Sequence, residues 1–315
     1  MRIAIISDIH ANFYALESVF ANIDKQKRRV DEYFCLGDVI GYGSEPVKVI
    51  ELLAERIPPE NVVTGNHEDL YVGLDDFSFN ASAMMAMHYE KYQISTSSKA
   101  IDYLKQVTNS PLDLVRREVK NTNFILSHNG PGKNYDMYHY PWMDDVLLPN
   151  LMKRFQDTNI INDVGKKRFW NSNRKNIFLI GHSHIPMVFC ENLHNGHEKS
   201  LVLEKTYEFK DKSRDFENIV INPGSVGYSR DGDTRASYVI IDLQRKVIEL
   251  HRVSYDIEQN LKSVVAMGKW LSDNLPPNVG LGDVDKALSS LIQSMRNACL
   301  PSKAPDDWKT KMIKG

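Results

Sequence analysis

Residues 2–10 read RIAIISDIH, a short apolar run that stops at a serine, an aspartate and a histidine. A continuous apolar run of this length, bounded by polar residues, is typical of a strand that is buried on both faces. A helical pattern follows it, with apolar residues on one face at Ala15, Leu16, Val19, Phe20 and Ile23. A buried strand followed by an amphipathic helix favours an α/β fold.

The same pattern recurs along the chain. Further apolar runs end in polar clusters at residues 33–36, 62–64, 124–126, 177–180 and 219–221. A second helical face is marked by Val47, Ile50, Leu53 and Ala54. After Pro186, short turns separate successive apolar runs, so we expect a second, more antiparallel sheet there. These later runs cover residues 188–190, 200–207, 236–243 and 247–253, and helical spacing returns at residues 256–273 and again after residue 285.

The composition is that of an ordinary globular protein of 315 residues, with 42% hydrophobic and 25% charged residues. A formal net charge of -2 gives no basic excess of the kind that nucleic-acid-binding domains carry. Cys35, Cys190 and Cys299 form no C-x-x-C pair, so neither a disulfide framework nor a thiolate zinc site is indicated, and a cytoplasmic location is expected. No apolar stretch approaches the roughly 18 residues of a membrane span.

Polar motifs that carry chemistry follow the apolar runs. They are Asp8-x-His10, Gly37-Asp38, Gly65-Asn66-His67-Glu68, Ser127-His128 and Gly181-His182-Ser183-His184. Because open α/β sheets bind ligands outside the carboxyl ends of their strands, we expect these distant motifs to converge on one crevice. The glycines that precede several of them would let the backbone turn sharply beside a bound ion.

The side chains in these motifs form a metal-binding set. Two carboxylates, one amide and four or five imidazoles suit divalent Mn, Fe, Co, Ni or Zn better than Ca or Mg. Seven ligands are too many for one ion with an open position, but they suit two ions that share a bridging carboxylate. Two such ions, roughly 3.5–4 Å apart, would clamp a phosphoryl oxygen and generate a hydroxide at neutral pH.

Each motif taken alone also has a structural explanation. Asp8 could cap the following helix, Gly37-Asp38 and Gly65-Asn66 could be simple turns, and His128 could be a buried core histidine. Their joint occurrence at strand ends favours the metal site. Further candidates to line the site are His139 and the basic stretch Lys166–Arg168.

The ordered set of motifs resembles the calcineurin-like metallophosphoesterase family. The segments Gly37–Gly43 and Asn222–Tyr238 are similar to a small bacterial stand-alone branch of that family. The resemblance covers residues 1–280, and it implies a four-layer αββα sandwich with two mixed β-sheets flanked by helices. It therefore predicts one metallophosphoesterase domain over residues 1–280 and a C-terminal helical extension and tail over residues 281–315.

The resemblance also implies a role for each motif residue. One metal would be bound by Asp8, His10 and His184, and the other by Asn66, His128 and His182. Asp38 would bridge the two metals. His67 matches a histidine that is not a ligand and that donates a proton to the leaving oxygen or clamps the phosphoryl group. The cofactors would be two divalent transition-metal ions, with Mn favoured over Fe, Ni, Co or Zn.

The chain departs from the family pattern in places that affect the substrate pocket rather than the ligands. Ala11 stands where a glycine is common, and Asn129-Gly130-Pro131 follows the mid-chain histidine in place of a Gly-Ser-Pro-like run. Residues 141–176 form an insertion between two expected core strands, which is a candidate lid. The insertion and the tail have no counterpart in the pattern.

The expected function is hydrolysis of phosphate esters by attack of a metal-bridging hydroxide. We favour a phosphodiesterase, because the sequence shows no dedicated basic clamp for a terminal dianion. The alternatives are a dinucleoside polyphosphate hydrolase, a phosphomonoesterase and a binding scaffold without catalysis, although the scaffold is disfavoured because every motif histidine is present. The expected partner is a small phosphate ester, with nucleotides among the candidates. No membrane partner is expected, and the sequence carries no strong nucleic-acid signal. The oligomeric state stays open.

Overall fold

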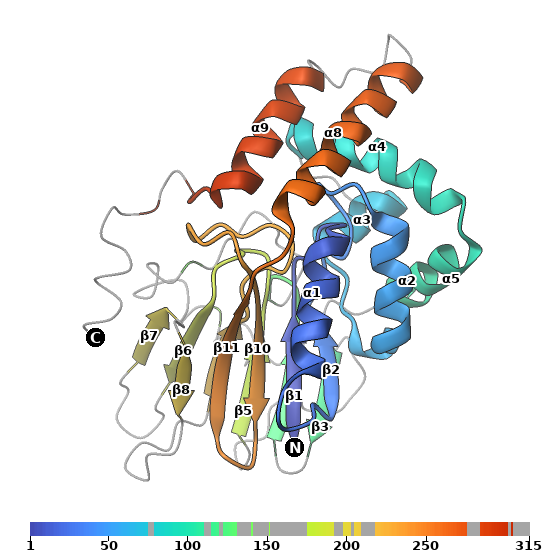
Figure 1. Cartoon of the computed structure of the whole chain (residues 1–315). Coiled ribbons are helices and arrows are strands. Elements are labelled where there is room, and N and C mark those ends of the chain that lie inside the picture. The colour runs from blue at the N-terminus through green and yellow to red at the C-terminus, as the bar shows by residue number, and fades with distance from the viewer. Residues whose placement is uncertain are drawn as a thin grey trace.

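Two mixed β-sheets packed face to face form the centre of the molecule (Figure 1). The computed structural model describes residues 1–74, 79–109, 115–119, 122–130, 140, 151, 175–191, 198–202, 205–208, 218–275, 284–301 and 304. Of the expected insertion 141–176, only Leu151 and the first two residues of one strand lie within this part of the chain. Lys166–Arg168 and His139 lie outside it.

The first sheet contains five strands and the second contains six. In spatial order the first sheet contains β2 (Glu32–Cys35), β1 (Arg2–Ile6), β10 (Ala236–Asp242), β11 (Val247–Val253) and β8 (Thr206–Glu208). The second contains β3 (Val115–Val119), β4 (Thr122–Leu126), β5 (Lys175–Leu179), β9 (Asn218–Asn222), β6 (Met187–Glu191) and β7 (Glu198–Val202). β1 runs parallel to β2, and β4 runs parallel to β5.

The expectation that the strands after Pro186 form a sheet of their own is wrong. β8, β10 and β11 join the N-terminal strands of the first sheet, whereas β6, β7 and β9 join β4 and β5 in the second. The expected strand 200–207 is split between β7 and β8, which lie in different sheets. Short turns predict that neighbouring strands exist, but long-range pairing decides which sheet each strand enters, as when β10 pairs with β1.

Alternate side chains of β1 pack into two different hydrophobic cores, one on each face of the sheet. This explains why its apolar run is continuous. Ile3 and Ile5 lie in the core between the two sheets. Ala4 and Ile6 lie in the core between the first sheet and its helices. The outer face of the second sheet is also buried, and Leu151 packs against it. Both faces of both sheets are therefore covered, and the expected αββα sandwich is confirmed.

Helices cover the outer face of the first sheet. In α1 (Phe13–Asp24), the five predicted apolar residues are the buried ones, and the Asn12 side chain caps the helix by accepting from the Ala15 amide. The other described helices are α2 (Pro46–Arg56), α3 (Asn66–Val72), α4 (Ala81–Ser95), α5 (Ser98–Thr108), α8 (Ile257–Asn274) and α9 (Val284–Asn297), with a short 3₁₀ turn at Pro59–Asn61.

The sequence patterns did not predict α4 and α5. No described helix is both long enough and apolar enough to cross a lipid bilayer.

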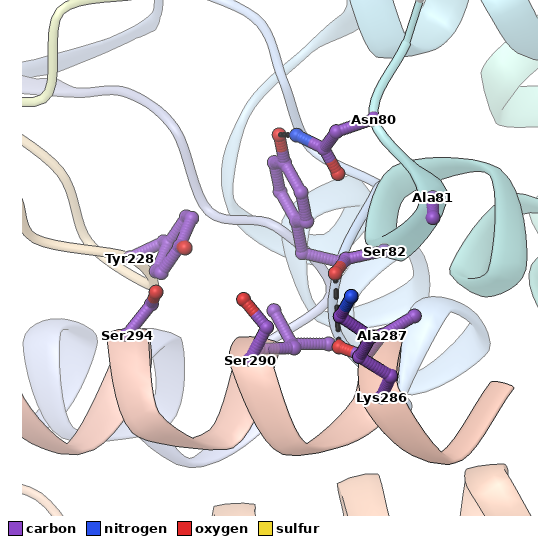
Figure 2. A pocket seen from close by; sticks show the side chains of 10 residues that line it. Asn80, Ala81, Ser82, Tyr228, Lys286, Ala287, Ser290 and Ser294 are labelled. Atoms are coloured by element: carbon purple, nitrogen blue, oxygen red, sulfur yellow. Dashed lines mark hydrogen bonds between the residues drawn. The ribbon is translucent and has the colours of Figure 1, made fainter. Parts of the chain in front are cut away.

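Three of these helices pack together beyond the carboxyl end of β1. α4, α8 and α9 contact one another and share an apolar cluster that includes Tyr42, Met85, Met267 and Leu291 (Figure 1). A cavity of about 500 Å³ opens between the start of α4 and one side of α9 (Figure 2). The C-terminal helix α9 therefore forms one wall of this cavity.

Truncation of an aromatic side chain in the core between the sheets should strongly destabilise the fold. The rings of Phe34 on β2 and Phe124 on β4 lie 5.8 Å apart, and both side chains are fully buried. Phe124→Ala removes these contacts and leaves a cavity, so we expect the free energy of unfolding to fall by about 3–5 kcal/mol in urea denaturation. Leu74→Ala, at an exposed position, is the control and should change it by less than about 0.5 kcal/mol. A loss below 1 kcal/mol for Phe124→Ala, roughly the cost of a surface change, would contradict the core assignment.

Candidate metal centre

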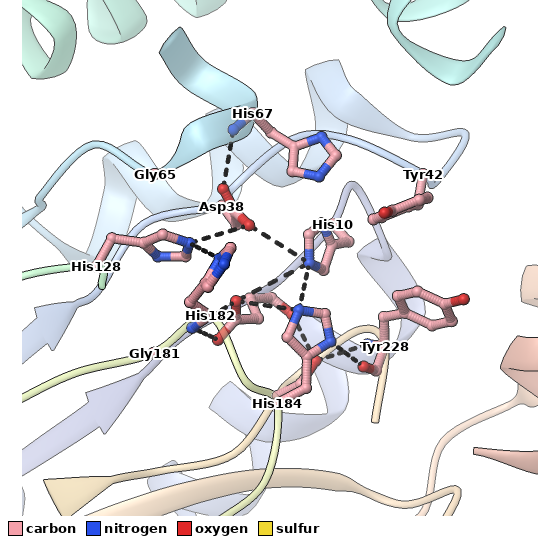
Figure 3. Close-up of polar contacts among 12 residues, drawn as sticks. His10, Asp38, Tyr42, Gly65, His67, His128, Gly181, His182, His184 and Tyr228 are labelled. Atoms are coloured by element: carbon pink, nitrogen blue, oxygen red, sulfur yellow. Dashed lines mark hydrogen bonds and ion pairs between the residues drawn. The ribbon is translucent and has the colours of Figure 1, made fainter. Parts of the chain in front are cut away.

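The structure brings the seven predicted ligands together at one end of the sandwich. Figure 3 labels His10, Asp38, His128, His182 and His184 among them. They come from the segments that follow β1, β2, β4 and β5 and from the first turn of α3. These residues are Asp8, His10, Asp38, Asn66, His128, His182 and His184, and each is buried. Since β1 and β2 are parallel, as are β4 and β5, their carboxyl ends deliver these side chains to a common place.

Four of these residues form a first ligand group. Asp8, His10, Asp38 and His184 each offer one atom, and these atoms lie within 4.8 Å of one another. The Nε2 atoms of His10 and His184 are 3.1 Å apart. His184 Nε2 lies 3.2 Å from Asp8 Oδ1, and His10 Nε2 lies 3.8 Å from Asp38 Oδ2.

A second ligand group shares Asp38 with the first. It consists of Asp38, His128 and His182, again with one atom of each residue within 4.8 Å of the others. His128 Nε2 lies 3.2 Å from Asp38 Oδ2 and 3.2 Å from His182 Nδ1. Asn66 Oδ1 is also 3.2 Å from His128 Nε2, so the amide belongs to this side of the site.

Backbone carbonyl groups orient three of the imidazole rings. The Nδ1 atoms of His10 and His128 lie 3.2 and 2.7 Å from the carbonyl oxygens of Ile40 and Leu36. His184 Nδ1 contacts the carbonyl oxygen of Tyr228 in the same way. An N–H at Nδ1 donates to each carbonyl and leaves an acceptor lone pair at Nε2, the arrangement that metal-binding histidines generally have.

The ligand atoms of the cluster suit divalent cations. Lone pairs at the Nε2 atoms of His10 and His184 face each other and the carboxylate oxygens, so acceptors converge without a matching number of donors. Such a cluster of buried acceptors is unfavourable unless positive charge lies among them. Two overlapping groups that share one carboxylate have the donor types and the number expected for two ions.

The electrostatics of the cluster point the same way. Burial lowers the pKa of His10 well below its ordinary value, so this ring is neutral and available as a ligand. Burial disfavours the charged forms of Asp38 and His128 as well, but their mutual attraction outweighs it. The pKa of Asp38 is therefore well below the ordinary range, and the pKa of His128 is raised to about 10. Without an ion, a proton on His128 supplies the positive charge that this pocket of carboxylates requires.

Comparison with known proteins identifies the family. The sequence model of the calcineurin-like phosphoesterases matches residues 1–215. The chain belongs to this family. An uncharacterized protein of Methanocaldococcus jannaschii is 32% identical over 276 residues, which are 87% of this chain and 96% of the relative. The family and the residue cluster together suggest a dinuclear site for divalent metal ions.

Solved structures of similar proteins agree with this assignment. A metallophosphoesterase from Sphaerobacter thermophilus has a TM-score of 0.63 and 25% identity, over 95% of this chain and 100% of that one. A hypothetical protein from Pyrococcus horikoshii has a TM-score of 0.54 and 13% identity, over 95% of this chain and 99% of that one, and this likeness concerns the fold alone. The phosphoesterase fold thus extends over nearly the whole chain.

The backbone of this phosphoesterase is strained at the site. Five of the seven predicted ligands have a positive φ, between 50° and 66°, although none of them is a glycine; these are Asp8, His10, Asp38, His182 and His184. Left-handed backbone costs such residues roughly 1–2 kcal/mol each, so the surrounding structure must hold them in place. One close approach depends on Gly65, because a Cβ there would lie 2.1 Å from Asp38 Oδ1.

Two buried glutamates hold the loop that carries Asp38. The carboxylate of Glu68 accepts hydrogen bonds from the amides of Asp38, Val39 and Ile40 at 2.9–3.2 Å. Glu90, on α4, accepts from the Gly41 amide at 2.9 Å. Glu68 belongs to a recognised motif, but the sequence did not reveal its part in shaping the loop. Glu90 has no motif context and was missed.

The predicted catalytic residue His67 lies beside the ligands. Its amide donates to Asp38 Oδ1 at 3.1 Å, and its ring centroid is 5.0 Å from that of His10. Within the described residues, its buried Nδ1 has no hydrogen-bond partner. Burial lowers the pKa of His67 to about 4 in the metal-free chain. The ring therefore stands next to the ligand groups with a polar atom that no described residue satisfies.

Sequence reasoning also missed an arginine and two tyrosines at the edge of the site. Tyr42 lies with its ring 4.8 Å from that of His67, and Tyr228 lies 5.6 Å from His184 (Figure 3). The guanidinium of Arg230 sits 5.2 Å from the Tyr228 ring. Burial is the largest cause that lowers the pKa of His184, and the positive charge of Arg230 lowers it further. The segment 222–238 carried a family signal, but nothing in it distinguished Arg230 as a neighbour of the ligands.

Glu90 should make the stability of the metal-free protein depend on pH. Burial raises the pKa of Glu90 well above its ordinary value of 4.5, so the folded chain keeps a proton that the unfolded chain loses. The resulting stabilisation is complete below about pH 4.5 and is lost as the pH rises through the folded-state pKa. Glu90→Gln removes this titration but keeps an oxygen acceptor for the Gly41 amide.

We therefore expect the variant to gain stability relative to the wild type as the pH rises above 4.5. The free energy of unfolding in EDTA, from urea denaturation, should show a difference that grows by at most about 1.4 kcal/mol per pH unit. Glu17→Gln, at an exposed position on α1, is the matched control and should not reproduce the trend. A difference for Glu90→Gln that stays constant with pH would contradict this role of the buried carboxyl group.

Proposed function

We propose that the chain hydrolyses phosphate esters, with phosphodiesters as the favoured substrates, at a centre of two divalent cations. The observation that carries the proposal is the pair of overlapping ligand groups that share Asp38. In this proposal Asp8, His10 and His184 would hold one ion, and Asn66, His128 and His182 would hold the other. Asp38 would be shared by both. Manganese is the favoured metal, and iron, nickel, cobalt or zinc would suit the same mixture of nitrogen and oxygen ligands.

When bound, the two cations would supply Lewis-acid activation of the phosphoryl group and of a water molecule. The residues of the chain hold this centre rigid and exclude bulk water from it, since the ligands are buried. The fixed backbone conformations and the Glu68 hydrogen bonds keep Asp38 in position without reorganisation during the reaction.

His67 is the proposed proton donor to the leaving oxygen. Its ring is adjacent to His10 but belongs to neither ligand group. Because its Nδ1 has no fixed partner among the described residues, either ring nitrogen can carry the proton. An anionic phosphoryl group next to the ring favours the protonated imidazole, from which a proton passes to the departing oxygen.

Arg230 supports phosphomonoester hydrolysis as a second candidate. The sequence argument for diesters rested on the absence of a basic clamp, yet the charge of Arg230 lowers the pKa of both His184 and His67. A guanidinium pairs well with a terminal phosphoryl dianion. A dinucleoside polyphosphate hydrolase remains an alternative substrate class, and a scaffold without catalysis would fail the activity tests below. The cytoplasmic location remains a prediction from cysteine usage.

Substitution of Asp38 and of His67 should separate metal binding from proton transfer. Asp38→Asn removes the shared carboxylate charge, so we expect both metal content and turnover to be lost. His67→Ala should retain the metal. Its kcat for a phenyl phosphodiester, which has a poor leaving group, should fall about 10²–10⁴-fold, and that for the bis(p-nitrophenyl) ester should fall much less. Metal analysis and steady-state kinetics with Mn²⁺ measure these effects.

The control for both variants is His251→Ala, because His251 stacks on Tyr238 in the first sheet rather than lying in the metal cluster. Equal losses for both esters in His67→Ala would assign His67 a clamping role. Wild-type protein that binds no transition metal, or that binds it without turning over any ester, would refute the proposed function.

Arg230 provides a test between monoesters and diesters. If Arg230 pairs with a terminal dianion, Arg230→Ala should lower kcat/KM for p-nitrophenyl phosphate about tenfold more than for the bis(p-nitrophenyl) ester. The matched control is Arg235→Ala, since Arg235 pairs with Asp233 at an exposed position. Equal effects on the two esters would remove this support for monoester hydrolysis.

A further inference from the structure

The cavity between α4 and α9 lies next to the metal centre. It has a volume of about 500 Å³ and is lined by residues of the α4 N-terminus, one side of α9 and two tyrosines (Figure 2). A cavity of this size accommodates a small organic ligand, whereas a methyl or hydroxymethyl group would leave most of it empty.

Tyr42 and Tyr228 connect the cavity with the metal centre. Both tyrosines line the cavity, and their ring centroids are 5.0 Å apart. Tyr42 also lies 5.0 Å from the His10 ring, and Tyr228 lies 6.0 Å from it. The two rings therefore border both the metal centre and the cavity.

The lining combines aromatic, hydroxyl and cationic groups. Besides the two tyrosines, it contains the hydroxyls of Ser82, Ser290 and Ser294 and the ammonium group of Lys286. None of the described lining residues is acidic, so the cavity suits a neutral or anionic group. Hydroxyls and an ammonium group are poor surroundings for an acyl chain, because they would lose water without gaining hydrogen bonds.

Hydrogen bonds preform part of this lining. The Asn80 side-chain amide donates to the Tyr42 hydroxyl at 3.1 Å, and the Ser82 hydroxyl donates to the Ala287 carbonyl at 2.9 Å (Figure 2). The second bond joins α4 to α9. Within the described part of the chain, the hydroxyls of Ser290 and Ser294 are not engaged in such bonds, so they are available to a ligand.

We propose that this cavity binds the nucleoside group of a phosphodiester whose phosphoryl group lies at the metal centre. The inference rests on the proposed function and names its substrate class. A base would stack against a tyrosine ring, and ribose or deoxyribose oxygens would bond to the serine hydroxyls. α9 lies beyond the residues 1–215 that the family model matches, so part of the cavity lining comes from the C-terminal part of the chain.

Two esters that share a leaving group test the proposal. Thymidine 5′-(p-nitrophenyl phosphate) and methyl p-nitrophenyl phosphate have the same charge and release the same phenolate, and they differ only in the nucleoside. The wild type with Mn²⁺ should show a higher kcat/KM for the thymidine ester. Ser290→Phe places a ring in the cavity and should lower the ratio of the two kcat/KM values by at least about tenfold, the scale of one lost stacking contact.

The matched control is Ser289→Phe. Ser289 is the neighbouring exposed serine on α9, and it does not line the cavity, so the ratio should stay at the wild-type value. Ser294→Leu is a second variant inside the cavity and should lower the ratio in the same direction. Far-ultraviolet circular dichroism verifies that each variant is folded.

Binding of thymidine alone to the metal-free protein gives a readout without turnover. Calorimetry should detect binding to the wild type and to Ser289→Phe, and at least about tenfold weaker binding to Ser290→Phe. Thymidine binding without hydrolysis of either ester would preserve the cavity proposal but refute the proposed function. Hydrolysis of both esters, with the same ratio in every variant and no thymidine binding, would overturn the cavity proposal alone. Binding of glucose or glycerol in place of thymidine would overturn the nucleoside assignment.

Discussion

Burial of two carboxylates among imidazole rings is the constraint on which the rest of this structure depends. Within the described part of the chain, the ion partners of Asp8 and Asp38 are histidines, and Nε2 atoms of His10 and His184 face each other at 3.1 Å. An uncompensated charge of this kind costs several kcal/mol when it is removed from water. The fold therefore has to keep positive charge at this point, as protons in the free chain or as metal ions in the proposed enzyme.

The sandwich makes such a centre possible because its two sheets are rigid and their cores are separate. The ligands stand on short segments at the carboxyl ends of β1, β2, β4 and β5, and strained backbone fixes the direction of most of them. Glu68 and Glu90 hold the Asp38–Gly41 loop through hydrogen bonds to its backbone amides. These two buried carboxyl groups thus define where the shared ligand lies.

The N-terminal and C-terminal parts of the chain contribute differently. Motifs up to His184 supply the ligands, whereas α8 and α9 pack on α4, and α9 lines a cavity at the edge of the centre together with the start of α4. Tyr42 and Tyr228 border both places, and Arg230 stacks on Tyr228. In the proposed enzyme, the reaction would take place at the metal centre, and the cavity between α4 and α9 would select the group attached to phosphorus.

Local pattern alone determined the buried strands, the α1 face and the seven clustered side chains, because apolar periodicity and motif spacing are properties of neighbouring residues. Only tertiary pairing decided to which sheet each later strand belongs. β10, for example, lies between β1 and β11, and its pairing with β1 joins segments more than 200 residues apart, which a local turn pattern does not predict. Glu90 likewise had no motif, and the family-like segments around Tyr42 and Arg230 did not distinguish these two residues. All three act on the site through contacts between segments far apart in sequence, and only the folded chain brings those segments together.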